Sequence, residues 1–386
     1  MAIKVPITRP ALGDPEIAEV VRVIQSGWIT QGPEVAALEK DFANAVLAKN
    51  AVAVSNCTVA LELALRVIGV GPGDDVVTVS HSFVATANCV VAVGGRPVFC
   101  DVEEATFGMD PRSLERSLTP RTKAILCVHQ IGIPCALEEI LAIGKKHGVP
   151  VIEDAACAIG SEIRIDGAWR RLGAPEGALA CFSFHPRKIV TTGDGGMITT
   201  QNDAFAKRLR LLRQHAMSVS DTVRHHSDKV VFEEYTETAF NCRMTDLQAA
   251  VGRPQLARLS EIVSTRRKLA DRYREALDGN SLFAAPTLGP NARSNWQSYP
   301  LRLKGNAKQI DVLQALVDRG IAAKRGIANS HQEPAYAGKT FWGMDGHGLP
   351  VSEKLRDTTI LIPLFHGMTD AEQTLVIDAL RAVSKA

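Results

Sequence analysis

Short apolar runs alternate with amphipathic stretches through the middle of the chain. Each run has the length of a β-strand and is apolar throughout, instead of at every second residue. The runs of this kind lie at 76–83, 96–102, 122–130, 149–156 and 178–184. Strands that are apolar on both faces are typical of a parallel sheet with helices on both sides. We therefore predict an α/β fold whose mostly parallel central sheet is flanked by helices.

The stretches between these runs, such as VALELALRVIGV and ALEEILAIGKKHG, have apolar residues at helical spacing. The pattern changes after about residue 255, where the long charged helix RLSEIVSTRRKLADRYREAL leads into shorter strands and helices. This change predicts a large α/β domain at 13–255 and a smaller C-terminal α+β domain at 256–386.

Composition limits the classes of function. The 386 residues are enough for two domains, and 44 basic against 42 acidic residues leave a net charge of only +2. Binding to nucleic acid or to a membrane surface needs a clustered basic excess, so we expect neither. No run is as long as the ~18 apolar residues of a membrane-spanning helix. The eight cysteines form no CxxC pair and lie mostly in apolar runs, which predicts reduced thiols and a cytoplasmic protein.

Ligands of an open parallel sheet bind beyond the carboxyl ends of its strands, so the residues that follow each strand are the functional candidates. The first candidate is SNCTVALELAL, where Cys57 and Thr58 precede a helix. Free backbone amides at a helix N-terminus, together with the Thr58 hydroxyl, suit a phosphate group. An ordinary N-cap explains the same residues, and both interpretations stay open at this point.

The second candidate is an acidic pair, Glu153 and Asp154, which ends a buried strand within the stretch VIEDAACA. A buried carboxylate must be paired with a cation or a hydrogen-bond donor, or else stay protonated. Successive strand residues point to opposite faces, so we expect one of the two to face the site and the other to make local hydrogen bonds. A helix cap or a salt bridge is the competing explanation.

The third candidate is Lys188 in FSFHPRKIVTTGDGG. Pro186 prevents the strand from continuing, and the glycines that follow permit a tight return. We expect Lys188 at the carboxyl end of a strand, where partial desolvation and nearby cations lower the pKa of a lysine and make it nucleophilic. A phosphate-binding or solvated lysine fits the local pattern equally well.

A phosphate cradle, a buried acid and a reactive lysine at one sheet edge are together what pyridoxal 5'-phosphate (PLP) requires. The phosphate needs helix-terminal amides, the pyridine nitrogen needs an acid, and the aldehyde needs a lysine. The ten histidines show no HExxH arrangement, so we predict no metal site.

The chain also resembles the DegT/DnrJ/EryC1/StrS family of fold-type-I, PLP-dependent aminotransferases, which aminate nucleotide-linked keto sugars. The resemblance is nearly full-length and rests on several separated motifs in the same order. They include SGWITQGPEVAALEKDFA, SNCTVALELAL, HSFVATANCVVAVGGRPVFCDV, VIEDAACAIGS, FSFHPRKIVTTGDGGMITT, FNCRMTDLQAAVGRPQL and LIPLFHGMTD.

The resemblance implies roles for individual residues. Lys188 is implied to form the Schiff base with PLP, and Asp154 to pair with the pyridine nitrogen. Phe83 is implied to stack on the cofactor ring, with Cys157 beside it. The implied phosphate contacts are the Cys57 backbone, Thr58, Ser183 and, from the partner subunit of a homodimer with shared sites, Asn241. The residues implied to lie near the substrates are Trp28, Thr30, His185, Arg243 and His331. We expect residues 1–12 to pack near the domain or dimer interface.

Four residues depart from the family pattern. Cys57 stands where relatives have Gly, and a backbone amide survives that change. Cys157 replaces Gln or His, Gln130 replaces Tyr, and Asp194 replaces Glu. Because Cys157 and Gln130 are expected near the cofactor and substrate, they put the identity of the acceptor in question more than the chemistry.

The expected reaction is a ping-pong transamination in which L-glutamate or L-glutamine is the amino donor and a keto sugar, nucleotide-linked in most relatives, is the acceptor. Two other acceptors stay open, a cyclitol ketone of the scyllo-inosose type and the precursor of an aminated aromatic acid. Sugar dehydratases of the family carry His in place of the lysine, so Lys188 argues against that activity. A non-catalytic regulatory homologue would lack the lysine or the acid, or carry a DNA-binding domain.

Overall fold

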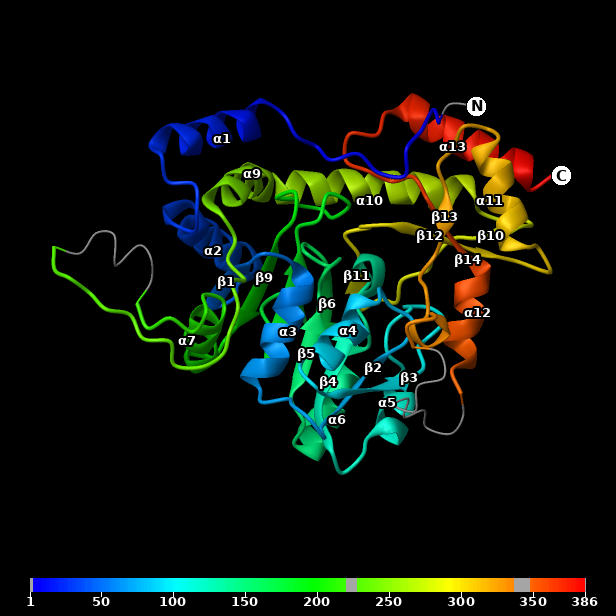
Figure 1. Cartoon of the computed structure of the whole chain (residues 1–386). Coiled ribbons are helices and arrows are strands. Elements are labelled where there is room, and N and C mark those ends of the chain that lie inside the picture. Colours follow the sequence, from blue (N-terminus) through cyan, green and yellow to red (C-terminus); the bar gives the residue numbers. More distant parts are fainter. Residues whose placement is uncertain (1–2, 220–227, 337–347, 386) are drawn as a thin grey trace.

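The computed structural model describes residues 3–219, 228–336 and 348–385 (Figure 1). A seven-stranded sheet with the strand order β1-β9-β8-β5-β4-β2-β3 forms its centre. The strands from β8 to β3 are parallel to their neighbours, whereas β9 runs antiparallel to both β1 and β8. The predicted mostly parallel sheet is therefore confirmed. Its strands are β1 (Asn50–Val54), β2 (Asp75–Val79), β3 (Arg96–Cys100), β4 (Thr122–Val128), β5 (Val151–Asp154), β8 (Leu179–Ser183) and β9 (Gly196–Thr200).

Helices cover both faces of this sheet, as its apolar strands require. Along β1, Val52 and Val54 pack into one hydrophobic core while Ala51 and Ala53 pack into the other, because successive strand residues point to opposite faces. The helices of the first core are α3 (Cys57–Val67), α4 (Ala85–Ala92) and α7 (Asp203–Leu212). Those of the second are α2 (Pro33–Val46), α5 (Pro111–Ser117), α6 (Leu137–His147) and α9 (Asp246–Ala257).

A second, antiparallel sheet with the order β10-β12-β14-β13 forms the C-terminal α+β part. The long helix α10 (Leu259–Ala276) leads to it and spans the upper side of the molecule in Figure 1. This part has its own core, which includes the buried Tyr273, Tyr299 and Phe365. Its other elements are β10 (Phe283–Ala284), β12 (Tyr299–Leu303), α11 (Gln309–Val317), β13 (Lys324–Arg325), α12 (Pro350–Thr358), β14 (Thr359–Ile362) and α13 (Asp370–Val383).

The N-terminal segment packs on this C-terminal core. Val5 forms a parallel bridge with Ile321 and is fully buried there. The chain then passes to α1 (Asp14–Ser26), which lies at the other end of α10 (Figure 1). The exact division of the chain at residues 255 and 256 stays a prediction.

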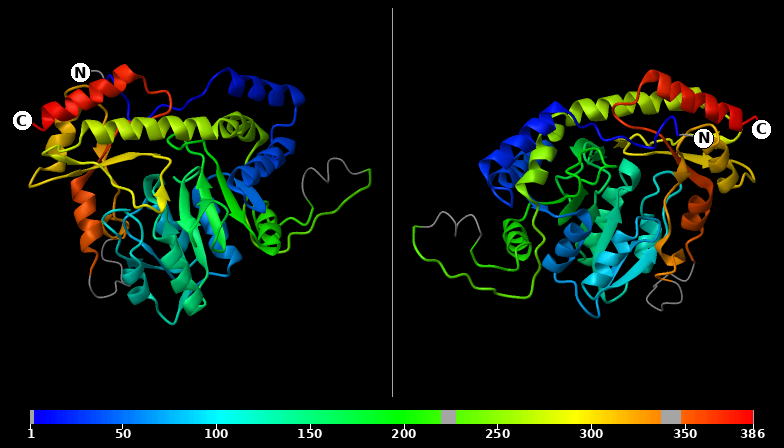
Figure 2. Two further views of the ribbon diagram at one scale, coloured as in Figure 1. Left: turned by 180° about the vertical axis from the view of Figure 1, so that it is seen from behind. Right: turned by 45° about the horizontal axis from the view of Figure 1, so that its top comes forward.

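Two smaller features complete the architecture. A three-stranded sheet of β11 (Ala292–Arg293), β6 (Glu162–Ile165) and β7 (Ala168–Arg171) pairs the segment after β5 with the segment after α10. The described parts of the chain between α7 and α9, on either side of residues 220–227, extend away from the central sheet, as the view from behind shows (Figure 2). Within the residues that the structure describes, no helix is long and apolar enough to cross a membrane.

The strands β1 and β9 were not among the predicted runs. The residues GMITT of β9 follow directly on the glycine-rich turn, and two of the five are threonines, so apolar content alone does not mark them as a strand. Their burial is complete because β1 and β8 pair with them on both sides.

Candidate active site

The predicted acid and lysine lie at neighbouring strand ends. Strands β5 and β8 are paired, with Asp154 opposite Cys181, so the chain leaves both strands at the same edge of the sheet. After β8 the backbone turns, and the Lys188 amide donates a hydrogen bond to the His185 carbonyl at 2.8 Å. The side chain of Lys188 is thereby directed into the space beyond Asp154, where the two groups interact electrostatically.

Asp154 is a buried carboxylate with two hydrogen-bond donors. The residue is only 4% exposed, and its carboxylate accepts hydrogen bonds from the Thr86 hydroxyl at 2.9 Å and the Ala156 amide at 3.1 Å. Burial raises the pKa of Asp154, and these two bonds oppose the rise without cancelling it. A carboxylate in this state gains stability from a cationic partner, such as a protonated ring nitrogen.

Glu153 points to the opposite face of β5, as strand alternation predicts. Its carboxylate lies 3.2 Å from His129 Nε2 and accepts a hydrogen bond from the Gly177 amide at 3.4 Å. Both Glu153 and His129 are buried. Asp154 is therefore the member of the acidic pair that lies on the Lys188 side.

The amine of Lys188 donates a hydrogen bond to the thiol sulfur of Cys157 at 3.0 Å. Burial lowers the pKa of Lys188, but Cys157, Cys57 and Asp154 together outweigh it, and the net pKa is raised. The expectation of a lowered pKa was wrong for the protein without its cofactor. Cations do lie nearby, since Lys188 and Arg187 help burial to lower the pKa of Lys324 on β13.

The N-terminus of α3 has a capping residue and leaves backbone amides without a helical partner. Asn56 caps the helix by accepting a hydrogen bond from the Val59 amide at 3.0 Å, so the N-cap interpretation holds for Asn56. The amides of Cys57 and Thr58, in the first turn, have no acceptor within the helix. Gly196, which pairs with Ser183 across β8 and β9, lies against this turn. Ser183 and the α3 amides therefore face the same corner.

Gly196 gives a first testable expectation. A Cβ atom there would lie 2.6 Å from the Asn56 carbonyl oxygen and 2.9 Å from the Cys57 nitrogen, both backbone atoms. Gly196→Ala must displace the start of α3, which we expect to cost about 1–3 kcal/mol of stability and to weaken phosphate binding. Thermal unfolding and PLP titration measure the two effects. Gly289→Ala, at a glycine with open space around it, is the matched control, and equal behaviour of the two variants would contradict the cradle.

An exposed aromatic ring completes the arrangement. Phe83 is 71% exposed although its neighbour Thr86 is buried, and the Thr86 amide donates to the Phe83 carbonyl at 3.0 Å. The ring therefore lies at the edge where Thr86 holds Asp154. PLP combines a flat ring, a basic nitrogen, a phosphate and an aldehyde. The residues that suit these four groups are, in the same order, Phe83, Asp154, the α3 amides and Lys188. The residues present thus fit PLP.

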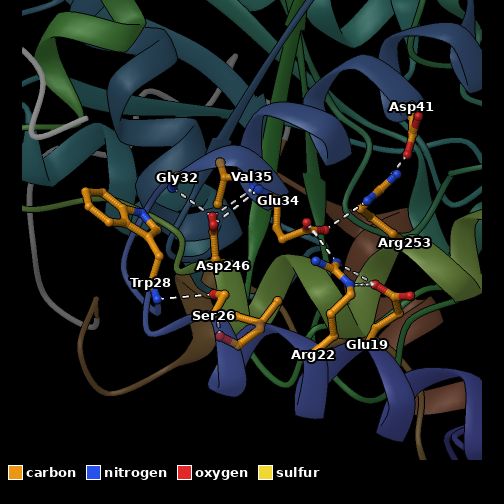
Figure 3. A network of polar contacts seen from close by, with 11 residues as sticks. Glu19, Arg22, Ser26, Trp28, Gly32, Glu34, Val35, Asp41, Asp246 and Arg253 are labelled. Atoms are coloured by element: carbon orange, nitrogen blue, oxygen red, sulfur yellow. Dashed lines mark hydrogen bonds and ion pairs between the residues drawn. The ribbon is translucent and has the colours of Figure 1, made fainter. Parts of the chain in front are cut away.

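Trp28 and Thr30, implied to approach the substrate, lie in the loop between α1 and α2. Asp246 at the start of α9 holds this loop (Figure 3). Its carboxylate accepts hydrogen bonds from the amides of Gly32 at 2.7 Å, Glu34 at 3.2 Å and Val35 at 3.0 Å, and its own amide donates to the Thr30 carbonyl at 3.1 Å. The contacts that Figure 3 shows thus attach the loop to α9, and its approach to the substrate stays a prediction.

The remaining predicted substrate residues, His331, Arg243 and His185, lie in three places. His331 bridges the two parts of the chain, with Nδ1 2.6 Å from the Ser80 hydroxyl at the end of β2 and Nε2 3.2 Å from the Glu353 carboxylate. Arg243 donates to the side chain of the exposed Asn241 at 3.1 Å, just before α9. His185 lies beside Lys188, and burial and Arg187 lower its pKa.

Two residues of the site and one cation near it were missed. Thr86 follows Phe83 by three residues in HSFVAT, so its place in the first turn of α4 was a usable signal. Asn295 donates to the Cys157 carbonyl at 2.8 Å and the Ile159 carbonyl at 2.7 Å, and Lys324 comes from β13. Both belong to the C-terminal half, where no local pattern indicates a contact with β5.

Comparisons with known proteins show which family the sequence and the fold resemble. The sequence model of the DegT/DnrJ/EryC1/StrS aminotransferase family matches residues 10–381 of this chain. The chain is 36% identical over 384 residues to the spore coat polysaccharide biosynthesis protein SpsC of Bacillus subtilis, covering 98% of this chain and 97% of that one. The structure of the aminotransferase TlmJ from Streptoalloteichus hindustanus is 34% identical, with a TM-score of 0.88 over 98% of both chains. Spr1654 from Streptococcus pneumoniae, solved in a PLP form, is 28% identical, with a TM-score of 0.89 over 99% of this chain and 98% of that one.

Proposed function

Since the chain belongs to the DegT/DnrJ/EryC1/StrS aminotransferase family, a PLP-dependent family of sugar aminotransferases, we propose that it transfers an amino group from L-glutamate or L-glutamine to a nucleotide-linked keto-deoxysugar. The observation that carries this proposal is the pair of Lys188 and Asp154 at the neighbouring ends of β8 and β5. The lysine also separates the chain from the dehydratase alternative, which requires a histidine there.

Each residue of the site has a part in the proposed reaction. PLP, when bound, supplies the electron sink for the carbanion. The carboxylate of Asp154, oriented by Thr86, holds a proton on the ring nitrogen. Lys188 Nζ would act as the base that takes the proton from the α-carbon of the donor and as the acid that returns a proton in the half-reaction with the acceptor. Phe83 would stack on the cofactor ring, and the α3 amides would hold its phosphate.

The acceptor is tested by separating the two half-reactions. Enzyme loaded with PLP and then treated with L-glutamate is expected to lose the yellow absorbance of lysine-bound PLP. Nucleotide-linked keto sugars are then expected to restore that absorbance, and inososes are not. Restoration by an inosose, or by an aromatic keto acid precursor, with nucleotide sugars inactive, would replace the proposed acceptor by that alternative. A protein that never becomes yellow would overturn the aminotransferase itself.

The homodimer is part of the same proposal. Val230, Phe232 and Tyr235, on the segment that extends from the body in Figure 2, are 84%, 88% and 61% exposed. Such apolar exposure is costly in an isolated chain. We propose that a second copy covers this segment and that Asn241, which follows it, reaches the phosphate in the partner's site.

Mixed dimers test this arrangement. Lys188→Ala is expected to inactivate its own site and Asn241→Ala to weaken phosphate binding in the partner's site. In a mixed dimer of the two variants, both defects fall on one site and the other site has only native residues. Mixing two weakly active variants is therefore expected to raise activity to about half of native per dimer, by simple subunit counting. Unchanged activity in dimers shown by mass to be mixed would mean that each chain builds its own site.

The proposed location is the cytoplasm. All eight cysteines are free, which suits a reducing compartment.

A further inference from the structure

Cys157 stands apart from the other cysteines of the chain. Six of the eight are buried, and only Cys57 and Cys157 are half-buried, both beside Lys188. Burial raises the pKa of the Cys57 thiol well above its ordinary range, which keeps it in the unreactive thiol form. The sulfur of Cys157, by contrast, accepts a hydrogen bond from the Lys188 ammonium at 3.0 Å. This contact places the Lys188 nitrogen where it can attack the sulfur once a peroxide has oxidised it to a sulfenic acid.

The backbone keeps the two side chains together. Asn295 donates to the carbonyls of Cys157 and Ile159, which anchors the turn after β5. On the other side, Gln297 donates to the Arg187 carbonyl at 2.7 Å, next to Lys188. Two residues of one short C-terminal segment thus clamp both backbones, and the contact between sulfur and amine does not depend on flexible loops.

We propose that Cys157 and Lys188 form a reversible covalent cross-link, a sulfenamide, when a hydroperoxide reaches the site while the Lys188 amine is not bonded to the cofactor. The proposal adds a modification site to the proposed function. Its effect on activity rests on the proposed role of Lys188, whereas the cross-link itself depends only on the contact with Cys157.

The chemistry balances in two steps. The Cys157 thiol and hydrogen peroxide give a sulfenic acid and water, so sulfur is oxidised and one peroxide oxygen leaves as water. The Lys188 nitrogen then attacks this sulfur, forming the S–N bond and releasing the hydroxyl as a second water, with the excess ammonium proton passing to solvent. A thiol reverses the link by forming a disulfide with Cys157 and returning the amine.

The cross-link would prevent PLP from bonding to Lys188. Lysine held in a sulfenamide has no free amine for PLP, so cross-linked protein is expected to bind PLP without the yellow absorbance until a thiol releases the lysine. When PLP is already bonded to Lys188, the nitrogen is occupied and the link cannot form. The amino form of the cofactor leaves the nitrogen free, so turnover with donor alone is expected to restore sensitivity to peroxide.

Peptide mass spectrometry tests the proposal on the full chain in three states: without cofactor, with PLP, and with PLP plus L-glutamate. After hydrogen peroxide, the first and third states are expected to give a linked pair of peptides containing Cys157 and Lys188, lighter by two hydrogens and cleaved by a thiol. The PLP state is expected to give at least roughly tenfold less of this pair, because the nitrogen is occupied.

Two variants distinguish the rival products. Cys57→Ser removes the alternative of a Cys57–Cys157 disulfide, which has the same mass loss, and is expected to leave the linked pair unchanged. Lys188→Ala is expected to stop at the sulfenic acid, trapped by a cyclic diketone reagent. A mass loss that disappears in Cys57→Ser, or Cys157 oxidised to sulfinic acid with Lys188 unlinked in the cofactor-free protein, would overturn the proposal. A linked pair in a protein that never becomes yellow with PLP would support the link while refuting the aminotransferase function.

Discussion

Lys188→Ala is expected to abolish the yellow absorbance with PLP and to reduce transamination by at least about 10²–10⁴-fold, the usual contribution of a positioned proton-transfer group. Two functions are lost together, since the same nitrogen bonds to the cofactor and moves the proton. Lys188→Arg keeps the charge near Asp154 and Cys157 but cannot bond to the aldehyde, so it is expected to lose the absorbance as well.

Lys324→Ala is the matched control for this loss. Lys324 is within electrostatic reach of Lys188 but comes from β13, outside the proposed bonding site. It is expected to retain the absorbance, which separates the loss of the bonding amine from a general loss of positive charge. Absorbance spectra and the rate of the glutamate half-reaction measure both variants. A yellow Lys188→Ala protein would move the assignment to another lysine.

Asp154→Asn is expected to have the second largest effect. The amide has the same shape but no charge, so the ring nitrogen loses the partner that holds its proton. Breaking a buried ion pair costs about 3–5 kcal/mol, and at about 1.4 kcal/mol per tenfold this corresponds to roughly 10²–10⁴ in rate. The rate of the glutamate half-reaction at saturating PLP measures the loss.

The same variant is expected to be more stable without cofactor. Burial raises the pKa of Asp154, so the folded protein holds this proton more tightly than the unfolded chain. Stability is then highest below the ordinary pKa of an aspartate and falls as the pH rises through the folded pKa, because the charge must be carried in a buried site. Asparagine carries no charge, so thermal unfolding at neutral pH is expected at a higher temperature. Lower activity together with lower stability would instead indicate a purely structural Asp154.

The fold could be predicted where apolar runs and strands coincide. The runs that became β2, β4, β5 and β8 are buried on both faces, and this burial determines their composition. Asp154 and Lys188 could be placed because Asp154 ends β5 and Lys188 lies in the turn that follows β8. Strand β9 could not, since its burial comes from pairing with β1 and β8 and not from its own apolar content.

Electrostatics and long-range contacts were beyond local patterns. The raised pKa of Lys188 depends on Cys157, Cys57 and Asp154, which reach it from two other strand ends. Asn295 and Asp246 act on segments more than a hundred residues away, on Cys157 and on the loop of Trp28. A hydrogen-bond partner so distant in sequence leaves no spacing to recognise.

The antiparallel direction of β9 has a consequence for how this family member can vary. Because β9 begins where β8 ends, Lys188 and Gly196 sit in one closed hairpin, and its length sets the distance along the chain from Lys188 to Gly196, which packs against the start of α3. In the proposed site, this loop would fix the distance between the lysine and the phosphate-binding amides. Insertions or deletions between these two residues would change this distance, whereas changes of loop length at the opposite edge of the sheet would not. Substrate preference is therefore free to diverge elsewhere while this loop keeps its length.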